Sequence, residues 1–388
     1  MRALLPLLLI ACGPSLDRGE PETRPEGAIP VQRGIVLDEA LADAFDEAIA
    51  PVLAESGVGL GVAVVKDGVV VYTAGYGWAD LASERPLEAS TPMQVASVSK
   101  TLIAVSAMQG VEAGRFSLDT PVADVLGFPV DNPRVDGDVI QLQQVLMHMS
   151  GIEDSKVYGG SYHSGDPAIG LLDFVQSYVT PDTEHYHKTN FSKRAPGEGF
   201  AYSNVGASLG ALAIAQAEGM EYADLVKRDI FEPLGMESSG FFRDDLPVAP
   251  ATNYAGRNRA WEPYGFPTYP DGLWRASPDD LGKFMAAIQG NTLLSEASTK
   301  QMLTVDPTIE GDEDGQALGW AQVGLVEGRV LMGHTGGDPG VGAFMALDLE
   351  SGVGVAFVLN SWDIELEVGG VAYSRAFDLA ETAETGGE

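Results

Sequence analysis

Apolar residues recur along the chain with two different periods, and the change between them predicts its layout. Residues 37–53 combine Ala, Asp, Glu and Leu with apolar positions at helical spacing, which predicts a helix. Residues 59–65 and 69–75 are Val-rich runs joined by the turn Lys66-Asp67-Gly68, which predicts a β-hairpin. From about residue 101 to 310 helical segments and long loops dominate. Helices are expected at 206–218, 222–230 and 278–288, and at 139–147, where a strand that turns into a helix is the alternative.

The end of the chain returns to strands. Residues 317–325, 329–333, 343–349 and 353–359 are β-rich, and residues 371–382 follow with the pattern of a closing helix. The order predicts an α/β protein of the α+β type, in which both chain ends form one antiparallel sheet flanked by helices, with a mainly helical inserted region. Residues 153–199 show little periodicity and are expected to form a long functional loop that shapes a pocket.

The acidic balance of the chain excludes one class of partner. Among 388 residues, 56 are Asp or Glu and 23 are Lys or Arg, which gives a formal net charge of −33. Nucleic-acid binding requires a basic surface, so nucleic acid is not an expected partner. With 45% hydrophobic residues the chain is expected to be globular, and its charge fits a very soluble exported protein or a salty habitat.

The N-terminus predicts export. Arg2 precedes a short apolar run that ends in Leu9-Ile10-Ala11-Cys12, and this run is shorter than the ~20 residues that span a bilayer. The end of the run resembles a bacterial lipobox, and Cys12 is the one cysteine of the chain. We predict a lipoprotein signal peptide at 1–12, with lipid attachment at Cys12 and anchoring to the cell envelope, in the periplasm or at the outer membrane. The alternative is an ordinary signal peptide that is removed together with Cys12.

The segment after the cysteine is predicted to be a flexible linker. Residues 13–36 carry four prolines among charged residues and show no apolar period. One folded domain is then expected over 37–388. A single cysteine allows no internal disulfide.

Ser97-Val98-Ser99-Lys100 is the main candidate for chemistry. The apolar residues that follow predict a buried helix, so Ser97 and Lys100 would lie three residues apart on one face of its first turn. A serine hydroxyl is a weak nucleophile at neutral pH, and an amine held beside it can take its proton. The alternative is a helix cap and a solvated lysine.

Two further motifs carry candidate site residues. Tyr202-Ser203-Asn204 precedes the Ala-rich segment 206–218 and by itself fits a helix cap. His334-Thr335-Gly336-Gly337 follows a predicted strand and by itself fits an ordinary turn with an exposed histidine.

Taken together and in this order, the three motifs resemble those of the serine β-lactamases and penicillin-binding D-alanyl-D-alanine carboxypeptidases, which are S-x-x-K, Y-x-N and then H-T-G or K-T-G on a strand. The tyrosine form of the second motif is similar to class C β-lactamases and related carboxypeptidases and esterases. The likeness extends from about residue 37 to 360 and implies a β-lactamase/transpeptidase-like fold. Further stretches that resemble the family are His148-Met149-Ser150-Gly151, Phe231-Glu232-Pro233-Leu234-Gly235-Met236 and Leu318-Gly319-Trp320.

The resemblance implies a role for each motif residue. Ser97 would be the acylated nucleophile and Lys100 its proton partner. Tyr202 would act as a base or as a relay to the leaving group, with the Lys100 cation favouring its phenolate. Asn204 would hold Lys100 or the substrate amide. Thr335 and Gly336 would line the substrate site, and the backbone N–H groups of Ser97 and Gly337 would form an oxyanion hole.

The third motif departs from the lactamase pattern, because His334 stands where these lactamases usually carry lysine. This favours a carboxypeptidase-like or esterase-like enzyme over a β-lactamase. His334 would bind a substrate carboxylate when protonated or donate a hydrogen bond when neutral. The expected function is therefore a serine hydrolase with an acyl-enzyme on Ser97. The alternatives are a β-lactamase and a non-turnover module that binds penicillin or cell-wall fragments.

No metal or other cofactor is expected. The chain has five histidines, no H-E-x-x-H motif and no cysteine pair. His185 and His187 are two residues apart, a spacing that would let both bind a metal from one face of a strand. A solvated loop fits this stretch better. The expected partner is a small-molecule or peptide substrate, with peptidoglycan-derived peptides among the candidates.

Overall fold

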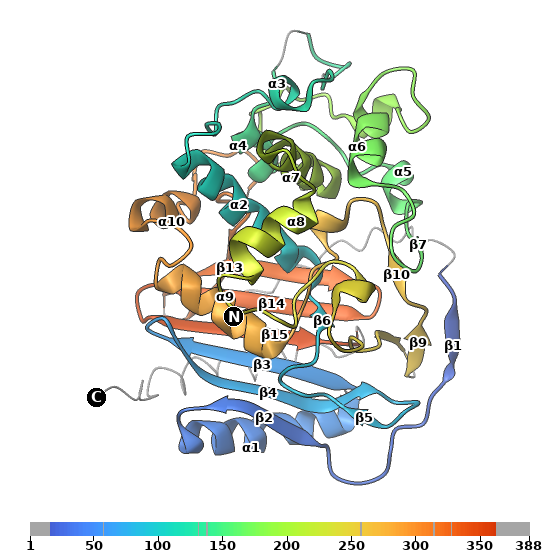
Figure 1. Ribbon diagram of the computed structural model, residues 1–388, viewed down its shortest axis with the longest axis vertical. Coiled ribbons are helices and arrows are strands. Elements are labelled where there is room, and N and C mark those ends of the chain that lie inside the picture. Colours follow the sequence, from blue (N-terminus) through green and yellow to red (C-terminus); the bar gives the residue numbers. More distant parts are fainter. Residues whose placement is uncertain are drawn as a thin grey trace.

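One antiparallel sheet joins the two ends of the folded chain. The computed structural model describes residues 16–361 except 57, 131, 137–138, 257, 313–314 and 327. Within these residues eight strands form the sheet, in the order β12-β13-β14-β15-β3-β4-β2 with β5 paired to β4 (Figure 1). Their bounds are β2 (Val31–Val36), β3 (Gly59–Lys66), β4 (Val69–Asp80), β5 (Arg85–Pro86), β12 (Ala321–Val326), β13 (Arg329–Asp338), β14 (Val341–Asp348) and β15 (Val353–Leu359). The predicted sheet from both chain ends is confirmed.

The central pairings follow from the sequence pattern. In the β3–β4 hairpin Lys66 pairs with Val69, and the two turn residues Asp67 and Gly68 have φ angles of 49° and 77°. Positive φ at both positions suits the twist of a tight hairpin, which is why an Asp-Gly pair occurs there. Strand β15 then pairs with β3 along its length, from Val353 opposite Lys66 to Leu359 opposite Leu60. This pairing unites segments that lie almost 300 residues apart.

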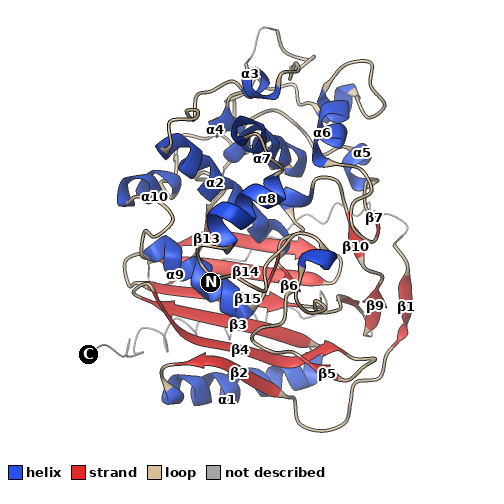
Figure 2. Ribbon diagram, in the orientation of Figure 1, coloured by secondary structure: helices blue, strands red, loops and turns tan. Residues whose placement is uncertain are grey.

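Each face of the sheet is covered by helices (Figure 2). Along β3, Val62 and Val64 join a core cluster with α1 (Glu39–Ser56), whereas Ala63 and Val65 join the larger cluster on the other face. Helix α9 (Pro278–Gln289) packs on that second face. Alternate side chains of one strand therefore enter two separate cores.

The helical region is inserted between the two halves of the sheet. In addition to α9, its helices are α2 (Lys100–Glu112), α3 (Val122–Leu126), α4 (Leu142–Leu146), α5 (Lys156–Gly159), α6 (Leu171–Val179), α7 (Asn204–Glu218), α8 (Tyr222–Val226) and α10 (Glu296–Met302). Helix α2 is buried from Lys100 to Met108, as its all-round apolar sequence predicts. The Ser203 side chain caps α7 by accepting the Gly206 N–H, and the Ser277 side chain caps α9 by accepting the Asp280 N–H.

Two sequence-based predictions are wrong in part. The segment 13–36, predicted to be a flexible linker, contains β1 (Arg18–Pro21), which pairs with β9 (Arg259–Trp261), and β2, which extends the sheet beside β4. Such a segment can form backbone hydrogen bonds to the unpaired edge of a neighbouring strand, and these bonds hold it in place even where its apolar pattern is weak. The segment 153–199, read as nearly aperiodic, contains α6. The buried positions Leu171, Phe174, Val175 and Tyr178 of α6 do follow helical spacing.

Three predictions fall outside the described residues, namely the signal peptide at 1–12, the lipid attachment at Cys12 and the closing helix at 371–382. Among the residues that are described, none of the helices combines the length and the apolar character needed to cross a membrane.

Candidate active site

Ser97 lies in a short turn that feeds directly into α2. Residues Ala96–Ser99 form the 3₁₀ turn η1, and Lys100 is the first residue of α2. Ala96 has a φ of 47°, a left-handed conformation that costs an L-residue about 1–2 kcal/mol. Strain of this kind directly before a candidate nucleophile is typical of functional turns. Ser97 is 8% exposed and Lys100 only 1% exposed.

The Lys100 amine contacts three oxygen atoms. Its Nζ lies 3.1 Å from Ser97 Oγ, 2.7 Å from Asn204 Oδ1 and 2.8 Å from the Asp271 carbonyl oxygen. The Asn204 amide oxygen and the Asp271 carbonyl oxygen are acceptors only, so each takes one N–H of the amine. As an ammonium, Lys100 donates its third N–H to Ser97 Oγ. Once it has lost that proton, its lone pair faces the Ser97 hydroxyl, which can then donate. The arrangement therefore suits an amine that removes the Ser97 proton.

Asp154 fixes the side chain of Asn204. Its Oδ2 accepts hydrogen bonds from Asn204 Nδ2 at 2.8 Å and from the Asn204 backbone N–H at 2.9 Å, and its Oδ1 accepts from the Val205 N–H at 3.0 Å. Burial raises the pKa of Asp154, and these N–H donors and Lys100 oppose the rise. Because the amide nitrogen of Asn204 points to Asp154, its oxygen must point to Lys100. Asp154 was missed from the sequence, although it lies just after the His148-Met149-Ser150-Gly151 stretch.

Tyr202 stacks against a buried histidine. Its ring lies 4.2 Å from the His148 ring at an interplanar angle of 29°, and the Lys100 ammonium position is 5.0 Å from the Tyr202 ring centre. His148 Nδ1 accepts the Ser203 N–H, so a neutral His148 carries its proton on Nε2. Burial, together with Lys100, holds the pKa of His148 well below its usual range. Tyr202 itself is 38% exposed and can therefore meet a ligand.

His334 is a neutral histidine rather than a cation. Burial, reinforced by the nearby Lys100 charge, lowers its pKa to about 4. Its Nδ1 lies 2.5 Å from the Thr335 carbonyl oxygen and is therefore the donor, which leaves Nε2 as an acceptor. Of the two roles expected for His334, the carboxylate-binding cation is disfavoured at neutral pH.

Strand β13, which carries His334, packs against the turn η1 that contains Ser97. Pairing of β12 with β13 stops at Gly333, so residues 334–338 pair with β14 alone. On this open edge of β13, backbone N–H and C=O groups that do not pair with β14 face outward. Gly337, the predicted oxyanion-hole donor, lies on this part of β13. A Cβ on Gly336 would lie 2.4 Å from the Val95 carbonyl oxygen, which explains the glycine at this close approach.

Two carboxyl groups that the sequence did not single out lie close by. Asp338 accepts hydrogen bonds from Gln94 at 2.7 Å and from the hydroxyls of Tyr162 and Tyr264 at 2.9 Å each. Asp271 has the Tyr158 hydroxyl 3.4 Å from its Oδ1. Burial raises the pKa of both carboxyl groups to about 7. Of these two carboxyl groups, only Asp338 could have been singled out from the sequence, because Asp338 directly follows the motif that ends at Gly337.

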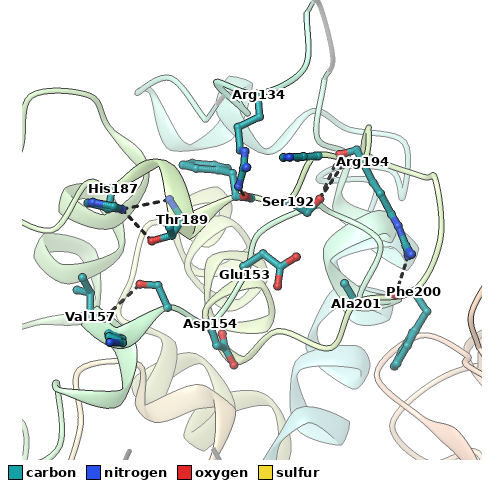
Figure 3. Close-up of a pocket in the computed structure, with 14 residues that line it drawn as sticks. Arg134, Glu153, Asp154, Val157, His187, Thr189, Ser192, Arg194, Phe200 and Ala201 are labelled. Carbon is teal, nitrogen blue, oxygen red and sulfur yellow. Dashed lines mark hydrogen bonds between the residues drawn. The ribbon is translucent and has the colours of Figure 1, made fainter.

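A cavity of about 1050 Å³ opens beside Phe200 and Ala201, which directly precede Tyr202. We call it the lateral cavity; residues of 153–157 and of 187–201 line it, together with Arg134. Figure 3 shows Arg134, His187 and Arg194 on different sides of this space, with Glu153 between them. Most of its lining residues belong to the segment 153–199, and the role of this segment in shaping a substrate pocket stays a prediction. His187 lies on the rim and accepts the Thr189 N–H at Nδ1. In the described part of the chain no three His, Cys, Asp or Glu side chains converge as metal ligands do.

Comparison with known proteins gives the family. A family model described as beta-lactamase matches residues 45–376. The chain belongs to the beta-lactamase family. The resemblance and the fold class expected from the motifs are confirmed, and this family is one of hydrolases that includes esterases and carboxypeptidases.

Several relatives of this beta-lactamase-family chain are known. It is 26% identical to penicillin-binding protein 4* of Bacillus subtilis over 302 residues, which are 73% of this chain and 64% of the relative. It is 28% identical to the esterase EstB of Burkholderia gladioli, over 60% of this chain and 66% of EstB. It is 25% identical to the D-alanyl-D-alanine-carboxypeptidase/endopeptidase AmpH of Escherichia coli, over 69% of this chain and 70% of AmpH. The chain thus spans somewhat under two thirds of penicillin-binding protein 4*.

Solved structures share the fold. The octameric penicillin-binding protein homologue from Pyrococcus abyssi superposes with a TM-score of 0.69 at 25% identity, over 87% of this chain and 76% of that one. The D-amino acid amidase of Ochrobactrum anthropi also gives a TM-score of 0.69, at 22% identity, over 88% of this chain and 98% of that one.

Proposed function

We propose that the chain is a serine hydrolase that forms an acyl-enzyme on Ser97 and cleaves small esters or peptide-like acyl compounds. The observation that carries this proposal is the contact of Lys100 Nζ with Ser97 Oγ at 3.1 Å, while two carbonyl oxygens occupy the other directions of the amine. EstB and AmpH, named as an esterase and a carboxypeptidase/endopeptidase, support hydrolysis as the type of reaction.

In the acylation step the Ser97 hydroxyl proton passes to Lys100 as Oγ attacks the substrate carbonyl carbon. The negative charge that develops on the carbonyl oxygen faces the N–H groups of Ser97 and Gly337, and such donors are typically worth ~10²- to 10³-fold in rate. Tyr202 passes a proton to the departing alcohol or amine. In the second step water attacks the Ser97 ester and gives its proton to the Tyr202 oxygen, while Lys100 returns its proton to Ser97 Oγ as the acid leaves, so that all three residues regain their starting states.

The neutral state of His334 favours an esterase-like specificity over a carboxypeptidase-like one. A D-alanyl-D-alanine substrate ends in a carboxylate, and a cation in the third motif is the group that would hold it. His334 supplies no such charge at neutral pH, because its pKa is lowered to about 4. By the same reasoning, efficient β-lactam hydrolysis is only the second candidate for the function of this chain.

The test is a comparison of three substrates with wild type and Ser97→Ala. We expect turnover of 4-nitrophenyl acetate that disappears in Ser97→Ala, with slower release of D-alanine from diacetyl-L-Lys-D-Ala-D-Ala. Intact-protein mass spectrometry with benzylpenicillin then separates the alternatives. A persistent adduct without ester turnover would indicate a non-turnover binding module, rapid release of opened penicillin would indicate a β-lactamase, and ester turnover that survives Ser97→Ala would refute the assignment.

We also propose export and lipid anchoring, on the lipobox-like sequence that ends at Cys12. Expression of the full chain in a bacterial host should yield a membrane-fraction protein whose N-terminal residue is a diacylglyceryl-modified Cys12. Cys12→Ser should abolish the modification. A mature protein that begins beyond residue 12 would contradict lipid attachment, although not export.

A further inference from the structure

The lateral cavity reverses the charge balance of the chain. Four of the residues that line it are Arg134, Lys156, Lys193 and Arg194, and two carboxyl groups, Glu153 and Asp154, accompany them. Cations outnumber acidic groups two to one here, whereas the whole chain has 56 acidic residues against 23 lysines and arginines. A protein of this charge repels anions over most of its surface, so a local positive excess marks a place where an anion can bind.

The four cations are available to a ligand. Among the described residues none of them forms an ion pair with a carboxylate, whereas Arg33, Arg228 and Arg329 do so elsewhere. All four are exposed. Arg134 and Arg194 each use one N–H group on a backbone carbonyl, of Phe191 and Phe200 respectively. An arginine has five N–H donors, so most remain free for a carboxylate.

The cavity adjoins the catalytic groups. Asp154 belongs to its lining and also accepts the Asn204 side-chain amide at 2.8 Å, and Asn204 in turn accepts from Lys100 at 2.7 Å. One side chain therefore separates the cavity wall from the catalytic amine. Ala201 also lines the cavity and directly precedes the exposed Tyr202. An arm of a ligand at Ser97 that passed Tyr202 would reach this space, which is as large as a typical small-molecule site.

We propose that the lateral cavity binds an anionic, carboxylate-bearing arm of the substrate that is cleaved at Ser97. This inference rests on the proposed hydrolase function and specifies its substrate class. Carboxylate is the ordinary anionic group of acyl compounds derived from peptides, and arginine binds it through two parallel hydrogen bonds. The cavity thereby supplies the anion recognition that the neutral His334 does not.

Two matched ester pairs test the proposal. In the first pair the charge is on the acyl arm, with 4-nitrophenyl hydrogen glutarate against 4-nitrophenyl pentanoate. In the second pair it is on the leaving group, with 4-acetoxybenzoate against methyl 4-acetoxybenzoate. We expect a higher kcat/KM for the anionic member of at least one pair, despite the overall charge of −33. This preference should fall when the ionic strength rises from 10 mM to 0.5 M, because salt screens exposed charges.

Two variants should move the preference in opposite directions. The double change Lys156→Gln/Lys193→Gln should lower kcat/KM of the anionic ester by about fivefold and leave the neutral ester unchanged. In contrast, Glu153→Gln removes a repulsive charge and should raise kcat/KM of the anionic ester about twofold. An effect of unfolding could not produce both signs.

The matched control is Lys227→Gln/Lys300→Gln. It changes the net charge equally, but Lys227 and Lys300 are exposed residues outside the cavity lining. An equal loss in this control, or neutral and anionic esters that are cleaved alike in both pairs, would overturn the inference while the hydrolase function stands. If wild type cleaves none of the four esters, the proposed function itself fails and the inference with it.

Discussion

Asp154 and Asn204 are held together by two hydrogen bonds, from the side-chain and the backbone nitrogen of Asn204 to the same carboxylate oxygen at 2.8 and 2.9 Å. The carboxylate thus decides which end of the amide faces Lys100. Because the amide oxygen is an acceptor and the amide nitrogen a donor, this choice determines whether the Lys100 amine is held or repelled.

Asp154→Ala should therefore reduce kcat about 10- to 100-fold and change KM much less, since Asn204 is then free to rotate away from Lys100. Steady-state kinetics with 4-nitrophenyl acetate and urea unfolding measure the two effects separately. Asp154→Asn keeps one acceptor oxygen and should recover part of the lost rate. Wild-type kcat in Asp154→Ala would show that Asn204 needs no positioning.

His334→Lys should raise the acylation rate with benzylpenicillin at least tenfold, because it places a cation where the substrate carboxylate lies. Turnover of 4-nitrophenyl acetate, which has no carboxylate, should change less. The measurement is the rate of adduct formation by intact-protein mass spectrometry, with His334→Gln as the uncharged control. An equal gain in His334→Gln would attribute the effect to shape rather than charge.

Asp338→Asn should make stability less dependent on pH. Burial raises the pKa of Asp338 to about 7, well above its unfolded value of ~3.9, so the folded protein binds a proton that the unfolded chain releases in this range. Wild-type stability from this group is present below about pH 4 and is lost as the pH rises through 7. The variant should therefore gain about 1–3 kcal/mol relative to wild type between pH 4 and pH 8. Urea unfolding at both pH values is the measurement, and parallel losses in the two proteins would argue against a buried neutral carboxyl group.

Gly336→Ala should displace the turn that carries Ser97. Its new Cβ would lie 2.4 Å from the Val95 carbonyl oxygen, closer than real contacts allow. We expect a loss of about 1–3 kcal/mol in unfolding free energy and at least a 10-fold loss in kcat/KM. Gly342→Ala is the control, since Gly342 lies on the neighbouring strand and the nearest atom to its Cβ would be 3.7 Å away. Comparable losses in both variants would point to general weakening of the sheet.

Local sequence pattern predicted most elements of this protein. Helices α7 and α9 occur close to their predicted ranges, because capping serines and apolar spacing act within a few residues. The hairpin β3–β4 and strands β14 and β15 are confirmed for the same reason. The order of the three motifs was also readable, and it led to the family that the comparison establishes.

The sequence by itself therefore determined the alternation of helices and strands, the family and the candidate residues Ser97, Lys100, Tyr202, Asn204 and His334. Only the tertiary structure decided how they act together. Packing brings Asn204 and the Asp271 carbonyl to Lys100 from 104 and 171 residues away, and Asp154 to Asn204 from 50 residues away. Burial makes His334 neutral. The lateral cavity and the sheet pairing of β2 arise in the same way. Periodicity is a property of neighbours in the chain, whereas desolvation and contact between distant side chains depend on how the elements pack.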